Sequence, residues 1–359
     1  MDVAGTFTDL AAIGDGRVVT AKVSSTPADQ SKGVIDAIQA SSLDAKAIAA
    51  LAHGLTVATN ALLERARAQV ALITTEDFRD ILEIGRQNRP ALYDLTQRPP
   101  EPLVARAHRF TVRERMGREG EITPLDMASV GAAIEAIRAV GNIEAIAICL
   151  LFSFEYPEHE IAVAKRVANA LPELHVSRSS AVLPEFREYG RFATTSANAY
   201  LSRRLNRYLD NLAGHRDAAG LPEPTVMQFS GGVIDIHIAA ANTAKGVLSG
   251  PAGGVVGAAW LGSLSGEADL LTFDMAGTST DVAPIAHGEA PATTDSVVAG
   301  VPIKLPMASA GGGSIAWADE GGALRVGPAS AAPNPARPPN ISAATMPRSP
   351  TPTSSWPYR

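Results

Sequence analysis

Two short segments of this chain repeat one pattern, and the repeat constrains the fold more than any other feature. Residues 2–9 read Asp-Val-Ala-Gly-Thr-Phe-Thr-Asp, and residues 274–281 read Asp-Met-Ala-Gly-Thr-Ser-Thr-Asp. Both follow Asp-x-Ala-Gly-Thr-x-Thr-Asp, and the flanking apolar residues predict a sharp turn between two strands. Because an internal repeat reveals architecture, we expect one such loop in each half of the molecule.

The residue types in the repeat suit a polyphosphate ligand. Glycine lets the backbone approach phosphate oxygens, consecutive N–H groups can line an anion site, and threonine hydroxyls can donate to the same oxygens. The candidate phosphate ligands are Gly5, Thr6, Thr8, Gly277, Thr278 and Thr280. Asp2 and Asp274 are candidate Mg²⁺ ligands, mostly through water, because Mg²⁺ prefers few carboxylates plus phosphate. Asp9 and Asp281 are candidate catalytic residues that could orient water or an attacking group. Two matched copies favour this interpretation over two structural hairpin turns.

The bulk composition excludes several classes of function. A net charge of −6, with no cluster of Lys or Arg, argues against nucleic acid as a partner. No stretch of 18 or more apolar residues predicts a membrane span, and the N-terminus lacks the features of a signal peptide. The one cysteine, Cys149, lies in an apolar run and is predicted to be a buried thiol, which suits a reducing cytoplasm.

Hydrophobic periodicity predicts an α/β protein in which strands alternate with helices. Strands are expected at residues 7–13, 17–23, 48–53, 70–74, 110–116, 145–152, 226–229 and 270–273. Helices are expected at residues 31–40, 60–67, 77–84, 125–140, 157–170, 185–211 and 253–261. We therefore divide the chain into a first lobe (1–184), a second lobe (185–330) and a Pro- and Ser-rich tail (331–359) that is predicted to be disordered.

Other polar residues have a functional and a structural interpretation. His53 opens a glycine-containing loop and could contact substrate, although Thr59 or Asn60 could equally cap a helix there. Gly311, Gly312 and Gly313 could form a ligand-facing loop or a tight turn. The arginines of the helix at 185–211 are predicted to lie on a solvated face. The remaining histidines show no metal spacing and are predicted to be surface or loop residues, namely His108, His159, His175, His237 and His287.

Several motifs, in this order, resemble one family. The two loops are similar to the Asp-x-Gly-Gly-Thr-x-Thr-Asp signatures of the hydantoinase A, 5-oxoprolinase and acetone carboxylase group of actin-like ATPases. Residues 53–60, His-Gly-Leu-Thr-Val-Ala-Thr-Asn, resemble that group's His-Gly-Thr-Thr-x-Ala-Thr-Asn block. Residues 248–258 resemble its glycine-rich helix between the lobes, where close helix packing and a hinge are both open interpretations. The resemblance covers about residues 2–330.

The resemblance implies a duplicated ribonuclease-H-like fold with Mg·ATP held between two lobes. It also implies ATP-dependent opening of a cyclic amide, such as a hydantoin or 5-oxoproline, after phosphorylation of the amide oxygen. A hydantoinase B-type second subunit and a homo-oligomer are further expectations. The alternatives are a subunit that carboxylates a ketone with ATP and bicarbonate, and a truncated ATP-binding protein without activity.

Three departures from the family pattern affect these expectations. Ala4 and Ala276 replace the first glycine of each pair, and a methyl group there can hinder close approach to phosphate. Ser230 stands where the family has Asn. The strand before the first loop is reduced to a residue or two, and residues 332–359 match no family block, so we expect an incomplete second lobe without the adenosine-contacting motif.

Overall fold

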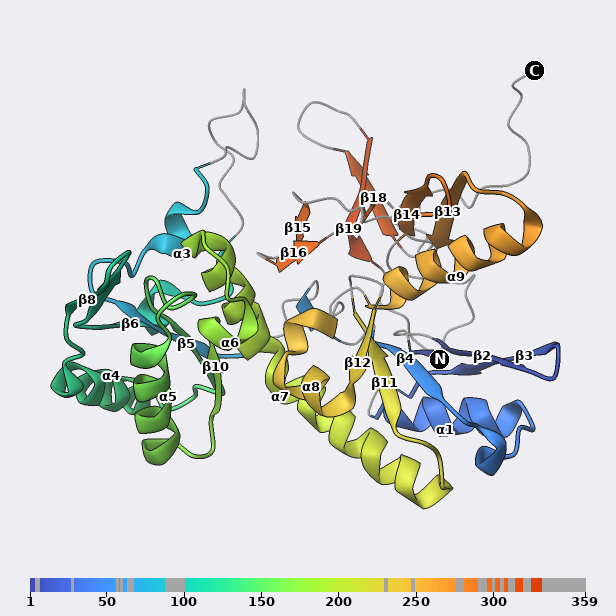
Figure 1. Ribbon diagram of the computed structural model, residues 1–359, viewed down its shortest axis with the longest axis horizontal. Helices are drawn as coiled ribbons and strands as arrows, with labels where there is room; N and C mark the ends of the chain where they lie inside the picture. The colour runs from blue at the N-terminus through green and yellow to red at the C-terminus, as the bar shows by residue number, and fades with distance from the viewer. Residues whose placement is uncertain are drawn as a thin grey trace.

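The computed structural model describes most of the first two thirds of the chain and parts of the rest (Figure 1). The described residues are 1–3, 7–26, 29–55, 58, 61–62, 68–87, 101–228, 232–246, 249–275, 280–289, 296–298, 301–303, 307–308, 314–318 and 324–330. The predicted helix at 60–67 and the tail at 331–359 therefore fall wholly or mostly outside the described residues.

The first sheet has the strand arrangement of a ribonuclease-H-like lobe. Its order is β12-β11-β4-β1-β2-β3, formed by Asp2–Val3 (β1), Phe7–Gly14 (β2), Arg17–Ser24 (β3), Leu51–Leu55 (β4), Pro224–Met227 (β11) and Val233–Asp235 (β12). Strands β1, β2 and β3 form an antiparallel meander, whereas β4 runs parallel to β1 and β11 runs parallel to β4. Helix α1 (Ser31–Ala40) buries Val34, Ala37 and Ile38 against this sheet. The predicted α/β fold class is confirmed.

A second, fully parallel sheet is inserted between β4 and β11. Its order is β10-β9-β5-β6, formed by Val70–Thr75 (β5), Arg109–Val112 (β6), Ala145–Cys149 (β9) and His175–Arg178 (β10). Strands β5 and β9 are buried along their whole length, as parallel strands covered on both faces require. Helices α4 (Met127–Val140) and α5 (Glu158–Ala170) cover one face. Cys149 lies in the core on the other face, as predicted.

Shorter elements complete the inserted part. They are α3 (Ile81–Ile84), a 3₁₀ turn at Arg106–His108, the hairpin of β7 (Arg115–Gly117) and β8 (Gly120–Thr123), and α6 (Ser179–Val182). A helix was predicted over residues 77–84, but only its last four residues are helical. Asp77 has a positive φ of 68° and Asp80 has φ −101° and ψ 12°, neither of which is helical.

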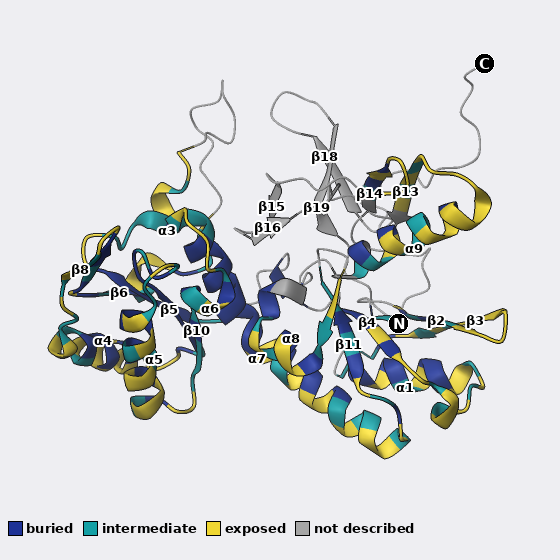
Figure 2. Cartoon of the chain, in the orientation of Figure 1, coloured by how far each residue is buried: buried dark blue, intermediate teal, exposed yellow. Residues whose placement is uncertain are grey.

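The 32-residue helix α7 (Glu188–Ala219) joins the two sheets. Its first half packs on the inserted sheet through Phe192, Ala197 and Leu201, and its second half packs on the first sheet through Leu205 and Leu209. The burial colouring shows the buried stripe continuing along the helix (Figure 2). A single rigid element thus touches both cores.

Strands β11 and β12 pair with the first sheet, although the sequence had placed residues 185–330 in a second lobe. The pairing of Pro224, Thr225 and Val226 with Leu51, Ala52 and His53 joins segments that are far apart in the chain. Local periodicity carries no information about that partner, so the strand was predicted but its sheet was not.

The second repeat forms a smaller copy of the first meander. Strands β13 (Leu270–Met275), β14 (Thr280–Ile285) and β17 (Met307–Ala308) pair antiparallel in the order β13-β14-β17, as β1, β2 and β3 do. Helices α8 (Ile236–Ala241) and α9 (Ser249–Ser265), separated by a 3₁₀ turn at Thr243–Gly246, precede the copy. Other described strands are β15 (Ser296–Val298), β16 (Val301–Ile303), β18 (Ser314–Ala318) and β19 (Leu324–Ser330).

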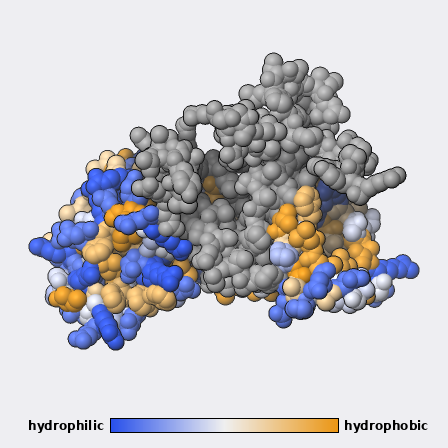
Figure 3. Space-filling model, turned by 90° about the horizontal axis from the view of Figure 1, so that it is seen from above, coloured by the Kyte–Doolittle hydropathy of each residue, from blue (hydrophilic) through white to orange (hydrophobic). Residues whose placement is uncertain are grey.

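One face of this second hairpin is covered and the other is not. Helix α9 packs through Val255 on Ala283 and Ile285, whereas Leu271 and Phe273 on β13 are 70% and 63% exposed. Apolar side chains also gather on the outer side of α9 (Figure 3). Within the described part of the chain, no helix is long and apolar enough to cross a bilayer.

Candidate functional site

The two repeated loops have the same strand register. In the first copy Asp2 opposes Asp9 and Val3 opposes Thr8; in the second copy Asp274 opposes Asp281 and Met275 opposes Thr280. Each motif is therefore a hairpin whose first and last aspartates are cross-strand partners. The repeated sequence predicts two equivalent loops, and the described strands on either side of each loop have the same register.

Asp2 lies where three elements meet. It pairs with Asp9 on β2 and with Gly54 on β4, and the Gly54 N–H donates to the Met1 carbonyl over 2.9 Å. A methyl group on Gly54 would lie 3.1 Å from Asp2 Oδ1 and 3.3 Å from Gly250 Cα, in the first turn of α9. The absence of a side chain at Gly54 thus allows the first turn of α9 to approach β4 closely beside Asp2.

The first turn of α9 brings the N-terminal end of a helix dipole close to Asp2. A helix N-terminus carries a partial positive charge and free N–H groups, which favour an anion nearby. Close packing accounts for the glycine at position 250 of this glycine-rich segment. At Gly253, by contrast, an added methyl group would make only an ordinary contact with Met227, at 3.8 Å. Helix α9 also packs on β13 and β14, so it connects the first loop with the second.

Asp9 holds an ion pair on the surface of the hairpin. Lys22 Nζ donates to both of its carboxylate oxygens, at 2.7 and 2.9 Å, and the Asp9 side chain is 47% exposed. This exposure leaves it accessible to solvent and ligands, and its catalytic role stays a prediction.

Thr8 does not face a ligand. It shares the buried face of the hairpin with Val3, because side chains alternate along a strand. Its hydroxyl bonds the Ser25 hydroxyl at 3.0 Å, and Gly33 of α1 packs directly on it. The prediction of Thr8 as a phosphate ligand is therefore wrong. The strand alternation inside the motif could have shown this.

His53 is also buried rather than presented to substrate. Its imidazole is 1% exposed, its Nε2 lies 2.6 Å from the Tyr208 hydroxyl, and the two rings stack at 5.6 Å. Burial lowers the pKa of His53 to about 3, and burial raises the pKa of Tyr208 well above its usual range. A neutral, enclosed imidazole cannot exchange protons with an external ligand. The predicted contact of His53 with substrate is therefore not seen, and His53 contacts Tyr208 inside the protein instead.

The sequence missed a buried ionic network at the carboxyl ends of β9 and β10. Glu160 accepts from the Leu150 N–H at 2.9 Å, the Ser179 hydroxyl at 2.6 Å and the Ser180 N–H at 2.8 Å. Arg191 donates to Ser179 Oγ at 3.1 Å and to the Leu150 carbonyl at 2.9 Å. Arg191 is fully buried, whereas the same helix was predicted to carry its arginines on a solvated face.

His159 is a second misplaced residue, predicted on the surface but buried between two carboxylates. Its Nδ1 lies 2.8 Å from Glu114 Oε2 and its Nε2 lies 2.9 Å from Glu121 Oε2. Glu114 also accepts from the Thr75 hydroxyl, which itself accepts from the Leu151 N–H at 3.1 Å. These hydrogen bonds hold the β7–β8 hairpin against the inserted sheet. No sequence pattern predicted them.

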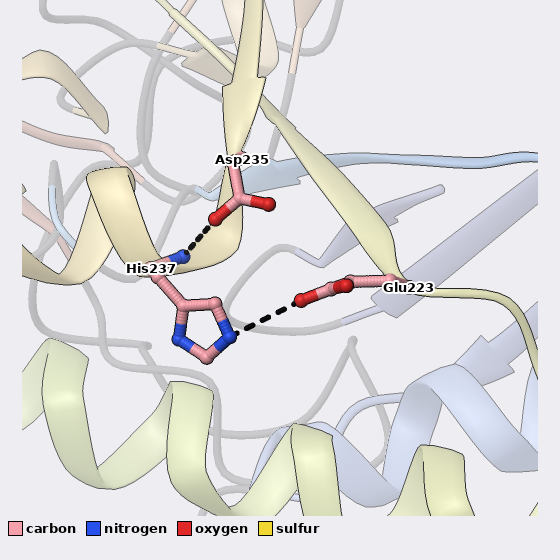
Figure 4. A group of neighbouring side chains, drawn as sticks. All are labelled: Glu223, Asp235 and His237. Atoms are coloured by element: carbon pink, nitrogen blue, oxygen red, sulfur yellow. Dashed lines mark hydrogen bonds and ion pairs between the residues drawn. The ribbon is translucent and has the colours of Figure 1, made fainter.

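One group in the described part of the chain has the composition of a metal site, and it lies away from the loops. Glu223, Asp235 and His237 offer ligand atoms within 4.8 Å of one another, and all three are exposed (Figure 4). They sit where β11 begins, at the end of the first sheet opposite to Gly54. Asp235 caps α8 by accepting from the His237 N–H at 2.7 Å, and His237 Nε2 pairs with Glu223 at 3.2 Å. Local capping and pairing account for the group.

The other predicted site residues are described only in part. Asp274, Thr280 and Asp281 have a described backbone, which sets their register. The remaining ones lie outside the described residues, namely Gly5, Thr6, Gly277, Thr278, Gly311, Gly312 and Gly313. Their roles as ligands stay predictions.

Comparison with known proteins decides the family. Sequence models of the hydantoinase/oxoprolinase N-terminal region and of hydantoinase/oxoprolinase match residues 1–171 and 191–345. This chain belongs to the hydantoinase/oxoprolinase family. The second match runs to residue 345, so the prediction that the family pattern ends at residue 330 is wrong. Residues 331–359 lie outside the described residues, and their predicted disorder stays a prediction.

Relatives of this family member have several activities. The chain is 34% identical to caprolactamase subunit alpha of Pseudomonas jessenii over 93% of its length, and 36% identical to 5-oxoprolinase 1 of Arabidopsis thaliana over 79%. The nucleotide-free structure of an acetone carboxylase matches with a TM-score of 0.83 and 28% identity over 92% of the chain. The chain spans 51% of the caprolactamase subunit, 24% of the oxoprolinase and 50% of the acetone carboxylase chain.

Proposed function

We propose that the protein takes part in the ATP-dependent ring opening of a cyclic amide, such as a hydantoin or 5-oxoproline. The observation that carries the proposal is the pair of loops with one sequence and one register, in which Asp2 opposes Asp9 and Asp274 opposes Asp281. A caprolactamase and a 5-oxoprolinase among the relatives support a cyclic amide as substrate.

The described residues fit Mg·ATP as the ligand. Asp2 offers a partly exposed carboxylate beside the first turn of α9, which suits a hard cation carrying phosphate groups. Asp2 and Asp274 would hold Mg²⁺, while Gly5, Thr6, Gly277, Thr278 and the Gly311–Gly313 run would hold the phosphates. When bound, ATP supplies a phosphoryl group that makes the amide carbon a better electrophile for water.

The protein's own groups would act by positioning and by charge. Loops on two lobes can grip one phosphoryl group from both sides, which lowers the barrier by orientation and by stabilising developing charge. Asp9 and Asp281, at equal register positions, would orient water or the attacking group. His53 has no direct part in this scheme, because its imidazole is neutral and enclosed.

A ketone carboxylase subunit is the second candidate. The specific observation in its favour is the structure of an acetone carboxylase, an enzyme of ATP-dependent acetone carboxylation, whose fold matches this chain. The two candidates share the nucleotide site and differ in the group that ATP activates.

The test is substrate-dependent ATP hydrolysis. The chain is purified alone and together with a hydantoinase B-type subunit, because one relative is itself named as a subunit. Phosphate release is then measured with hydantoin, 5-oxoproline, or acetone plus bicarbonate. Stimulation by a cyclic amide without bicarbonate supports the first candidate, and a requirement for ketone and bicarbonate supports the second. No stimulation by any of them contradicts both. A cytoplasmic location and homo-oligomerisation stay predictions.

A further inference from the structure

Tyr208 and His53 form a buried pair that joins the long helix α7 to strand β4. The Tyr208 hydroxyl lies 2.6 Å from His53 Nε2, and the rings stack with centroids 5.6 Å apart and an interplanar angle of 20°. Both residues are buried, Tyr208 within the core that includes Val3 and Leu205. The Met1 ammonium acts on His53, and the carboxylates of Asp29 and Asp2 act on Tyr208. A polar contact so enclosed is stronger and more directional than one in water.

The proton positions in this pair are defined by its surroundings. Burial lowers the pKa of His53 to about 3, so the imidazole is neutral, and burial keeps the Tyr208 phenol protonated by raising its pKa. The phenol therefore donates and Nε2 accepts, which leaves the imidazole proton on Nδ1. Nδ1 has no hydrogen bond of ordinary geometry among the described residues, although the Met1 backbone lies close enough to act on the pKa of His53. The Tyr208 bond, at 2.6 Å, is thus the better-defined contact that orients the ring.

The pair lies one residue from the candidate nucleotide site. His53 directly precedes Gly54, which opposes Asp2 across the β1–β4 ladder and lies against Gly250 of α9. Gly54 has no side chain that could adjust, so a shift of the end of β4 passes directly to Asp2 and to the first turn of α9. On the other side, α7 is anchored in the core of the inserted sheet through residues such as Phe192.

We propose that Tyr208 and His53 are positioning residues that set the end of β4, and with it the Asp2 loop and the first turn of α9. The pair acts through Gly54 and touches no ligand. The consequence for nucleotide binding rests on the proposed function, whereas the positioning itself does not.

The positioning is tested first without nucleotide, by hydrogen–deuterium exchange. Tyr208→Phe removes only the hydroxyl, and Tyr156→Phe is the matched control, because Tyr156 donates to the Arg118 carbonyl on the distant β7–β8 hairpin. We expect exchange in peptides covering residues 1–14 and 249–257 to rise about fivefold in Tyr208→Phe and not in the control. Unchanged exchange in α4 and α5 peptides shows that the variant is folded.

The functional arm is the affinity for Mg·ATP, measured by calorimetry. Tyr208→Phe and His53→Leu should each weaken binding about five- to tenfold, and the double variant should be no weaker than His53→Leu alone, because the two side chains act as a unit. His53→Gln, which keeps an acceptor, should recover part of the affinity.

A lower melting temperature with unchanged exchange in both peptides would overturn the proposal and leave the pair as core packing only. Altered exchange with additive losses of affinity would also overturn it, because the two side chains would then act separately. If the unsubstituted chain fails to bind Mg·ATP but exchange responds as described, the positioning holds and the proposed function fails.

Discussion

The Gly54→Ala substitution tests whether the first turn of α9 is seated on the Asp2 loop. The added methyl would lie 3.1 Å from Asp2 Oδ1, 3.3 Å from Gly250 Cα and 3.6 Å from Gly250 N. Asp2 Oδ1 is the end of a side chain and can turn aside, but Gly250 Cα belongs to the backbone of a 17-residue helix and does not move easily. To relieve the backbone contact, α9 and β4 must separate by a few tenths of an ångström.

The expected loss of affinity follows from the free-energy cost of overpacking. Inserting a methyl group into a tightly packed site costs about 1–3 kcal/mol. If α9 moves away from Asp2 and so releases the strain, the free energy of unfolding changes little. The free-energy cost then appears as weaker binding of the ligand. Since about 1.4 kcal/mol corresponds to a tenfold change in affinity, the loss for Mg·ATP would be roughly 5- to 150-fold.

The assay combines calorimetric titration with Mg·ATP and thermal unfolding. Gly131→Ala is the matched control: Gly131 lies inside α4, and an added methyl there meets no atom within 4 Å. Alanine in a helix interior should stabilise the control by about 0.5–1 kcal/mol without affecting nucleotide binding. If Gly54→Ala binds Mg·ATP as tightly as the unsubstituted chain and melts at the same temperature, the proposed seating of α9 is refuted.

Three further predictions follow from named contacts. Asp274→Ala should abolish Mg·ATP binding because it removes a carboxylate at the head of the second loop, and unchanged affinity by calorimetry would exclude that role. The pKa of His53 falls from 6.5 to about 3 on folding, so the unfolded chain takes up the proton first and stability should fall as pH drops from about 6.5 toward 3, by up to about 1.4 kcal/mol per pH unit. Urea titrations between about pH 4 and 7 should show this slope in the native chain and a smaller slope in His53→Gln, because burial also lowers the pKa of His175. Arg191→Met should destabilise by roughly 3 kcal/mol or more, because Arg191 is fully buried in the Glu160 network; the exposed Arg204→Met should stay within about 0.5 kcal/mol in the same urea assay.

Local patterns predicted the elements and the loops well. The helix at 31–40 and the strands that begin at residues 7, 17, 70, 145 and 270 were all found, because side-chain periodicity and turn residues act over a few neighbours. The repeated motif predicted two equivalent hairpins, and the shared register of Asp2 with Asp9 and Asp274 with Asp281 confirmed them.

The positions of the candidate site residues depend on contacts that a local pattern does not contain. Thr8 belongs to the phosphate motif by sequence, yet strand alternation turns it onto the buried face beside Val3. His53 belongs to a conspicuous polar block, but its partner, Tyr208, is 155 residues away in the chain. A one-dimensional pattern cannot distinguish a histidine that meets ligand from one that meets a distant tyrosine.

The sequence by itself determined the family, the α/β class and the two aspartate-headed loops, since each depends on residues within one short segment. The tertiary structure alone decided that β11 completes the first sheet and that α9 approaches Asp2. It also decided that Arg191 and His159 are buried with carboxylates from other elements. These features depend on which surfaces meet after folding, and burying a charged or polar side chain is tolerated only where a distant segment supplies its partner.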